Sequence, residues 1–197
     1  MGKVLTFQVG IEGLEDKIWR KIEITDRMTV ADLAYTILAT FDSLAYHLYD
    51  IKHGNDRYDC MIEPFDLGDS ILKDAVNTRL SKVDFESNNK MIMEYDFGSM
   101  TTFIITYLES REYNEYKGYL YPNIIDGQGR GMLDDMADFD LKEIIEDIDK
   151  KGYSEHYVTP GYEKHEKYDY RKFNIKTNNK NLKGLILLIK NGYEVDE

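Results

Sequence analysis

The chain has 197 residues, of which 42% are hydrophobic, and this suits one globular domain whose core needs neither a disulfide nor a metal. Its formal net charge of −12 disfavours a general nucleic-acid-binding surface, because affinity for phosphates comes mainly from lysine and arginine. The single cysteine, Cys60, excludes an intramolecular disulfide framework. It fits a cytoplasmic protein, and no apolar run is long enough to cross a membrane.

The N-terminal region is predicted to form a hairpin followed by a helix. Apolar residues alternate with polar or small ones over 5–11 and again over 18–24, which is typical of half-buried strands. Thr29 can cap a helix with Asp32 reaching back to it, and apolar residues then recur at helical spacing over 30–41. A hairpin followed by an amphipathic helix is the opening of a β-grasp sheet.

The middle of the chain is predicted to continue the sheet. Residues 46–51 and 57–62 read as further strands, and 72–76 allow one short helix. Residues 91–95 read as a strand, and 101–108 are rich in β-branched and aromatic residues. The two strands predict a second hairpin around a four-residue turn. In that turn Gly98 could supply a positive φ.

The C-terminal part is predicted to be mainly helical. The glycines of 127–131 predict a flexible loop, and Asp140 is expected to cap the helix that follows. Residues 153–172 look like a surface excursion. Residues 174–189 predict a last helix, although 185–189 could equally be a strand.

These elements predict an α+β fold. We expect an N-terminal β-grasp-like arrangement of hairpin, helix and strands with a mixed sheet, and then a helical part. Residues 1–197 would form one domain, with a β-grasp-like core at 1–110 and a helical and loop elaboration at 111–197.

One acidic segment is predicted to place its acids on a single face of a helix. Glu143, Glu146 and Asp147 fall on neighbouring positions opposite the apolar stripe of their helix, and the loop 126–136 precedes it. This pattern is consistent with a solvated helix face or with a docking face for a protein with a basic surface. The candidate partner-binding residues are Glu143, Glu146, Asp147, Arg130, Asp134 and Asp135.

Aromatic and polar residues of several strands suggest a small-ligand pocket as an alternative. The candidate pocket residues are Trp19, Arg20, His47, Tyr49, Tyr95 and Asp96. In the purely structural interpretation, Trp19 packs on the sheet or in the core, and Arg20 pairs with a carboxylate such as Asp96.

Metal and catalytic motifs are not evident in the sequence. His47, His53, His156 and His165 are scattered without the i, i+4 spacing of a helical metal site, and none lies beside a cysteine. There is no nucleophile elbow and no clear acid–base pair. We therefore expect no metal and no cofactor, and we favour a non-enzymatic function.

Several short motifs occur in order over nearly the whole chain. They are 19–22 (Trp-Arg-Lys-Ile), 29–33 (Thr-Val-Ala-Asp-Leu), 47–49 (His-Leu-Tyr), 95–98 (Tyr-Asp-Phe-Gly), 121–122 (Tyr-Pro), 126–129 (Asp-Gly-Gln-Gly) and 173–182 (starting Phe-Asn-Ile). In this order they resemble the plasmid pRiA4b ORF-3-like family, which is also met as passenger proteins of insertion sequences. The resemblance implies an α+β fold containing a β-grasp and a link to mobile elements, and it implies no established activity.

The chain departs from the family pattern in two places. After Tyr-Asp-Phe-Gly the family continues with Asp, Trp and His, where this chain has Ser99, Thr101 and Phe103. The family's Pro-Pro-Glu-Asp-Cys-Gly-Gly loop is replaced by 130–136, which lacks proline and cysteine. The signature is thus degenerate, and the resemblance implies that any chemistry or metal held by the family's polar cluster is lost here.

The leading hypothesis is a non-enzymatic accessory protein of a mobile genetic element that acts by binding another protein. A sharper form is an acidic inhibitor that occupies the nucleic-acid groove of a nuclease or host-defence effector. A small-ligand binder or enzyme is the first alternative. Direct nucleic-acid binding is the second, and it rests on basic residues within 164–183 that acidic neighbours dilute.

Overall fold

The structure, a computed structural model, describes residues 2–60, 71–113, 120–132, 138–156 and 167–194. The strands are β1 (Gly2–Ile11), β2 (Trp19–Thr25), β3 (Tyr49–His53), β4 (Asp56–Asp59), β5 (Ile71–Asp74), β6 (Lys90–Tyr95), β7 (Thr101–Tyr113) and β8 (Asn123–Gln128). The helices are α1 (Val30–Thr40), α2 (Asp138–Lys151) and α3 (Ile175–Glu194), with a 3₁₀ turn at Leu80–Lys82.

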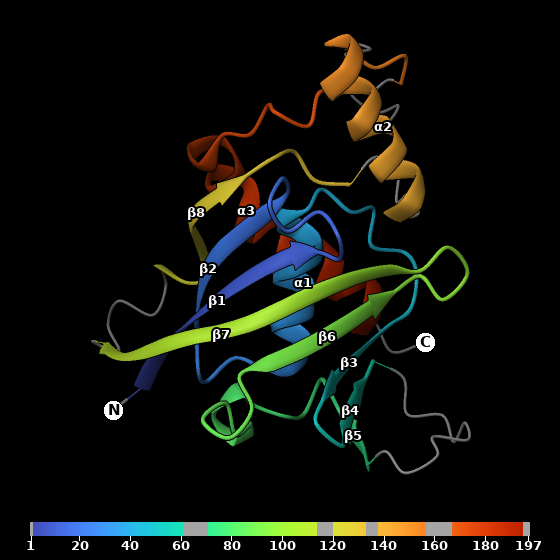
Figure 1. Cartoon of the computed structure of the whole chain (residues 1–197). Helices are drawn as coiled ribbons and strands as arrows, with labels where there is room; N and C mark the ends of the chain where they lie inside the picture. The colour runs from blue at the N-terminus through green and yellow to red at the C-terminus, as the bar shows by residue number, and fades with distance from the viewer. Residues whose placement is uncertain (1, 61–70, 114–119, 133–137, 157–166, 195–197) are drawn as a thin grey trace.

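The strands form one eight-stranded sheet in the order β5-β4-β3-β6-β7-β1-β2-β8 (Figure 1). All neighbouring strands are antiparallel except β4 and β5, which are parallel. The mixed sheet and the C-terminal helix confirm the predicted α+β class. The finer β-grasp assignment stays a prediction, as does the division at residue 110. The strand β8, from the C-terminal part, pairs with β2 of the N-terminal part.

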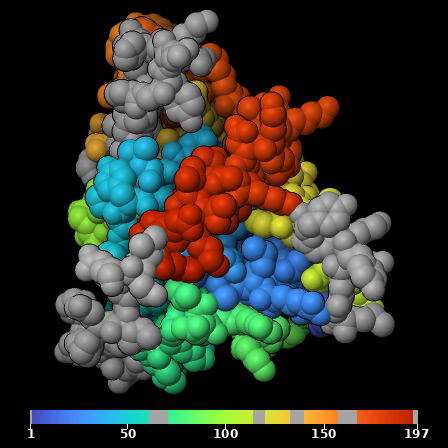
Figure 2. Space-filling view, turned by 180° about the vertical axis from the view of Figure 1, so that it is seen from behind, coloured from blue at the N-terminus to red at the C-terminus, as the bar shows by residue number. Residues whose placement is uncertain are grey.

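Helix α1 lies between the sheet and α3, and all of its residues are buried. The predicted capping box is present: the Thr29 hydroxyl accepts from the Asp32 amide at 3.0 Å, and the Thr29 amide donates to Asp32 Oδ2 at 2.9 Å. Lys190 of α3 reaches back to Asp32 Oδ1 at 2.9 Å. Seen from behind, α3 (red) lies across the middle of this face (Figure 2). The outer face of α1 is therefore part of the core.

The glycine segment 127–131 is not the flexible loop that we predicted. Its first residues end β8, which pairs with β2, and the Met132 amide donates to the Phe41 carbonyl at 2.6 Å. The free edge of β8 is closed by Asn179 of α3, whose side chain bonds both the amide (2.8 Å) and the carbonyl (2.7 Å) of Ile124. The start of the segment is therefore held in the sheet by β2, and its end is joined to Phe41.

Three predictions in the middle of the chain need correction. Residues 71–74 form the strand β5 and not a helix, because pairing with the edge of β4 overrides a weak helical pattern. In the β6–β7 turn, Asp96 (φ 56°) and Met100 (φ 52°) take the positive φ values, and Gly98 does not. Strand β3 also begins at Tyr49, later than predicted, so His47 precedes it.

The C-terminal predictions need three corrections. Helix α2 already includes Asp138, so Asp140 lies inside the helix and does not cap it. Residues 175–194 form one continuous helix, which excludes the strand interpretation of 185–189. Tyr168 and Tyr170, which we predicted to lie in a surface excursion, are buried. Among the described residues, no helix is both long and apolar enough to cross a membrane.

Candidate functional site

The six candidate pocket residues fall into two separate groups. Trp19 and Arg20 lie on β2, whereas His47, Tyr49, Tyr95 and Asp96 lie at β3 and β6. The strands β6, β7 and β1 separate β3 from β2 in the sheet. With neighbouring strands about 4.8 Å apart, β2 is roughly 19 Å from β3 and roughly 14 Å from β6. One small-molecule pocket therefore cannot be lined by all six.

The first group centres on His47. Its Nδ1 lies 3.6 Å from Asp96 Oδ1, and its ring packs edge-on against Tyr95 with centroids 5.8 Å apart. Asp96 also accepts from the Ser99 hydroxyl and from the Gly98 amide, and these bonds lower the pKa of its carboxyl group against the opposing effect of burial. The Asp96 charge therefore orders the β6–β7 turn.

Cys60 lies near the same group but is not prepared for nucleophilic chemistry. It shares with His47 a hollow of about 180 Å³. Burial raises the pKa of its thiol to about 11, and the thiol donates to the Tyr49 carbonyl at 3.4 Å. A thiol with this pKa is protonated near neutral pH, whereas a nucleophilic cysteine needs the thiolate. Tyr49 itself is a core residue, packed edge-on against Tyr35 and Tyr193.

The second group centres on Arg20, whose side chain is fully buried. The expected carboxylate partner Asp96 is at the other group, and backbone carbonyls take its place. Arg20 Nε donates to the Thr40 carbonyl at 2.9 Å, and Nη1 donates to the carbonyls of Trp19 at 2.9 Å and Gln128 at 2.8 Å. Main-chain dipoles therefore hold the guanidinium group.

Two aromatic rings complete the surroundings of Arg20. Its guanidinium carbon lies 3.8 Å from the centroid of Phe173 and 4.8 Å from that of Phe41, which are cation–π distances. Burial lowers the pKa of Arg20 to about 10, against the opposing effect of the Asp42 charge. Arg20 consequently stays positively charged at neutral pH.

The three glycines of 127–131 allow this arrangement. A Cβ at Gly127 would lie 2.9 Å from both the Trp19 carbonyl and the Phe173 ring. Gly129 has a φ of +76°, and a Cβ at Gly131 would collide with the backbone of Phe41. The Gly-x-Gly-x-Gly pattern therefore reflects close backbone packing around Arg20.

The predicted acidic face is on the outer side of α2. Leu141, Ile144, Ile145 and Ile148 are buried, which confirms the predicted apolar stripe, and Glu143, Glu146 and Asp147 are exposed. These three acids line one groove of about 570 Å³. The groove is completed by Asp140, Ile144, Lys150 and His156.

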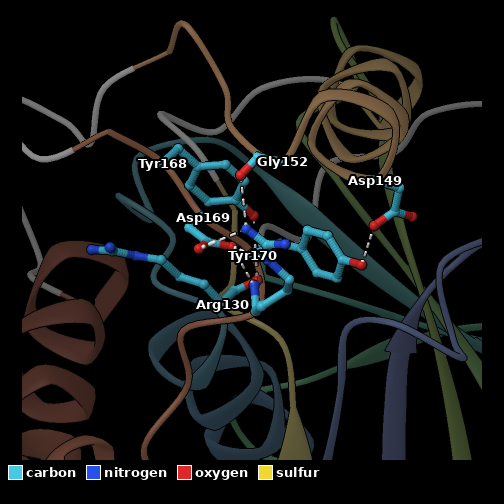
Figure 3. Close-up of polar contacts among 7 residues, drawn as sticks. Arg130, Asp149, Gly152, Tyr168, Asp169 and Tyr170 are labelled. Atoms are coloured by element: carbon cyan, nitrogen blue, oxygen red, sulfur yellow. Dashed lines mark hydrogen bonds and ion pairs between the residues drawn. The ribbon is translucent and has the colours of Figure 1, made fainter.

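The C-terminal end of α2 is fastened to the body of the protein by the segment 168–171 (Figure 3). Tyr170 donates to Asp149 Oδ1 at 2.6 Å, Lys17 also bonds Asp149, and Arg171 donates to the Gly152 carbonyl at 3.1 Å. The side of α2 that carries Asp149 is therefore used for attachment. The acids of the groove are not needed for it.

The remaining candidate residues are only partly described. Asp134 and Asp135 lie outside the described residues. The Arg130 amide donates to the Tyr170 carbonyl at 2.5 Å, and its side chain points away from Tyr168 and Tyr170 (Figure 3). Arg130 therefore does not join the acidic face of α2 and instead lines a second cavity, together with Asp42 and Phe173. Asp42 was missed because nothing in the local sequence marks it.

The motifs that carry the family resemblance meet at the two groups. The Trp-Arg strand, the Asp-Gly-x-Gly stretch and the segment starting at Phe173 meet around Arg20. The His-Leu-Tyr and Tyr-Asp-Phe-Gly motifs meet around His47. At the positions that depart from the pattern, Ser99 bonds Asp96, whereas Thr101 and Phe103 are buried.

Comparison with solved structures finds the same fold in a protein of unknown function, MM3350, from Methanosarcina mazei Go1. The TM-score is 0.70 at 21% sequence identity, over 90% of this chain and 98% of that chain. Comparison with curated proteins gives no match. The sequence model of the family described as "Plasmid pRiA4b ORF-3-like protein" matches residues 3–177. The chain therefore belongs to the plasmid pRiA4b ORF-3-like family.

Proposed function

We propose that this protein is a non-enzymatic, cytoplasmic accessory protein of a mobile genetic element, and that it binds a protein with a basic surface through the outer face of α2. The observation that carries the proposal is the groove in which Glu143, Glu146 and Asp147 are exposed together. The plasmid origin in the description of its family supports the link to mobile elements.

The acidic side chains of the groove can bind a partner with little loss of folding stability. Glu146 and Asp147 pair with Lys150 and Lys151 one turn later, at 2.9 and 2.8 Å. All four side chains are more than half exposed, and exposed pairs of this kind contribute little to stability. Arginine or lysine of a partner can therefore replace these lysines without unfolding α2.

A sharper form of the proposal is that the partner is a nuclease or host-defence effector whose nucleic-acid groove is covered by the acidic face. A chain with net charge −12 would be attracted to such a groove over a long range at low salt. Because the attraction is electrostatic, nucleic acid should compete with the protein for the same groove.

The alternative of one ligand pocket between Trp19 and Tyr95 is not supported, because the strands β7 and β1 separate the two residues in the sheet. Direct nucleic-acid binding rests on the basic residues of 164–183, of which 164–166 lie outside the described residues. We therefore retain protein binding as the proposed function.

The proposal is tested by purifying the tagged protein from its native host and identifying the proteins that co-purify. The purification is done at about 0.1 M and about 1 M salt, where the screening length falls from about 10 to about 3 Å. We expect a specific basic partner that is present at low salt and lost at high salt. The sharper form also requires that DNA or RNA displaces the purified partner.

A charge-reversal variant locates the interface. Changing Glu143, Glu146 and Asp147 to lysine should abolish capture of that partner. The matched control changes Glu12, Glu109 and Glu112, which are exposed residues elsewhere, to lysine and alters the net charge equally. Equal binding by both variants would show that α2 is not part of the interface. Equal loss of binding in both would show that binding depends only on the net charge of the protein.

A further inference from the structure

A second cavity, distinct from the acidic groove, lies beside the buried Arg20. It has a volume of about 440 Å³, within the usual range for small-molecule sites. It lies where the end of α1, residue Arg130 and the first half of α3 meet, on the side seen in Figure 2. The lining residues that matter are Asp42, Arg130, Lys172, Phe173, Asn178 and Asn181.

The cavity is electropositive although the chain as a whole is strongly acidic. Arg130 and Lys172 line it against one acid, Asp42, and residues 170–193 contain no aspartate or glutamate. The N-terminal end of α3 also opens here, and its first turn carries no acidic residue. The positive end of a helix dipole attracts anions.

Arg20 stands behind one wall of the cavity and adds an independent observation. Phe173, which lines the cavity, stacks on its guanidinium group at 3.8 Å. Within the described part of the chain, Nη2 of this fully buried group has no hydrogen-bond partner. The charge of Asp42 acts on both Arg20 and Arg130. The charged residues that line the cavity therefore carry one more positive than negative charge, and Arg20 behind the wall adds another positive charge.

The rest of the lining suits the body of an organic molecule. Asn174 precedes α3, and its side-chain oxygen accepts from the Thr177 amide at 3.1 Å. Thr177, Asn178 and Asn181 of α3 present a hydroxyl and two amides, which both donate and accept hydrogen bonds. Ala39 and Leu185 add apolar surface on the facing helices. The cavity therefore combines a cationic part with an uncharged polar wall.

We propose that this cavity binds a small organic anion with a phosphate or carboxylate group. The anionic group lies against Arg130, Lys172 and the N-terminal end of α3. The polar body of the molecule lies along the amides of Asn178 and Asn181, and Phe173 forms the wall shared with Arg20. This site is independent of the acidic face of α2.

The test is a titration of the isotopically labelled full chain, followed by amide chemical shifts in NMR spectra. The probes are inorganic phosphate, glucose 6-phosphate and succinate, at constant ionic strength set with chloride. We expect saturable shifts at 172–181 and around Arg130, with glucose 6-phosphate or succinate binding more tightly than inorganic phosphate. The tighter of the two organic probes identifies the anionic group.

Two variants and a matched control make the test specific. Arg130→Gln should weaken binding about tenfold, as expected for the loss of one charge-assisted hydrogen bond. Asn181→Asp, at an exposed position of the lining, should abolish it by adding a negative charge. Lys180→Gln removes a charge from the same helix outside the lining and should leave affinity unchanged.

Three results would overturn the proposal. The first is the absence of saturable shifts with all three probes in a folded wild-type protein. The second is equal weakening in Arg130→Gln and Lys180→Gln, which would show a general charge effect. The third is saturation by a thymidine oligonucleotide with none by the small anions, which would assign the basic side of α3 to nucleic acid.

Discussion

Two buried ionisable side chains, near opposite edges of the sheet, have different kinds of partner. Among the residues that the structure describes, Arg20 on β2 is surrounded by three carbonyls and two rings and has no acidic hydrogen-bond partner. Asp50 on β3, with a side chain 1% exposed, is paired with Arg57 at 2.7 Å. Burial raises the pKa of Asp50 to about 6, against the opposing effect of Arg57.

The comparison shows that an oppositely charged partner does not by itself keep a buried side chain ionised. Arg20 stays charged over the whole physiological pH range because burial lowers its pKa only to about 10, and fixed carbonyls accept its hydrogen bonds. The ion pair of Asp50 does not fully repay the cost of removing its carboxylate from water. We therefore expect the β2 end to depend on packing and the β3 end to depend on pH.

The largest effect is expected from Arg20→Met. This change leaves the carbonyls of Trp19, Thr40 and Gln128 without their donors, at a cost of about 1–3 kcal/mol for each group left unpaired. We expect the free energy of unfolding, measured by urea denaturation, to fall by at least about 3 kcal/mol. The control Lys21→Met, on the other face of β2, should change it by less than about 0.5 kcal/mol. Equal losses in the two variants would show that the hydrogen bonds from Arg20 to the three carbonyls do not contribute to stability.

The second effect is the pH dependence contributed by Asp50. Its folded pKa of about 6 lies above the ordinary value of 3.8, so its stabilising effect is complete below pH 3.8 and is lost as the pH rises through 6. Relative to Asp50→Asn, the wild type should lose about 2–3 kcal/mol between these limits.

Parallel urea titrations of both proteins at pH 4 to 7.5 measure this difference. The control variant Glu12→Gln, which alters an exposed acid elsewhere in the chain, should retain the wild-type pH profile. A constant difference between the wild type and Asp50→Asn at all pH values would show that Asp50 is ionised throughout and would remove the contrast with Arg20.

A smaller effect is expected for the bridge between α1 and α3. Lys190 is 36% exposed and Asp32 is 11% exposed, so solvent screens the pair in part. Lys190→Met should lower the free energy of unfolding by about 0.5–1 kcal/mol at low salt. The difference should shrink at about 1 M salt, where the screening length is about 3 Å. A loss that is independent of salt would point to packing of the lysine stem instead.

The smallest effect is expected on the acidic face. The pair Lys150–Glu146 is 68% and 64% exposed. Lys150→Met should leave the unfolding midpoint in urea unchanged within experimental error, because exposed pairs contribute little. A clear loss of stability would mean that the groove is structural and would weaken its assignment to partner binding.

The sequence predicted the parts of the fold that depend on local periodicity. The β1–β2 hairpin, the capping box at Thr29, the β6–β7 hairpin and the apolar stripe of α2 all follow from spacing within short windows. The strand β5 and the rigid segment 127–131 did not follow from it. The conformation of β5 is fixed by parallel pairing with β4, and that of 127–131 by pairing with β2, which lies more than a hundred residues earlier.

The candidate site was predictable to a smaller extent. The exposure of Glu143, Glu146 and Asp147 followed from helical periodicity. Arg20 was singled out, but its surroundings depend on Gln128 and Phe173, which lie more than a hundred residues later. Strand order also decided that Trp19 and Tyr95 are far apart, and strand order is not encoded in any local pattern.

The position of α1 between the sheet and α3 has a consequence for biosynthesis. About 130 residues follow α1 before α3 begins, which at 5–20 residues per second corresponds to roughly 7–27 seconds of translation. During that time the ring of Tyr35, which later stacks on Tyr193 at 5.4 Å, has no cover from α3. The nascent chain therefore passes through a stage in which a complete apolar helix face is open to chaperones.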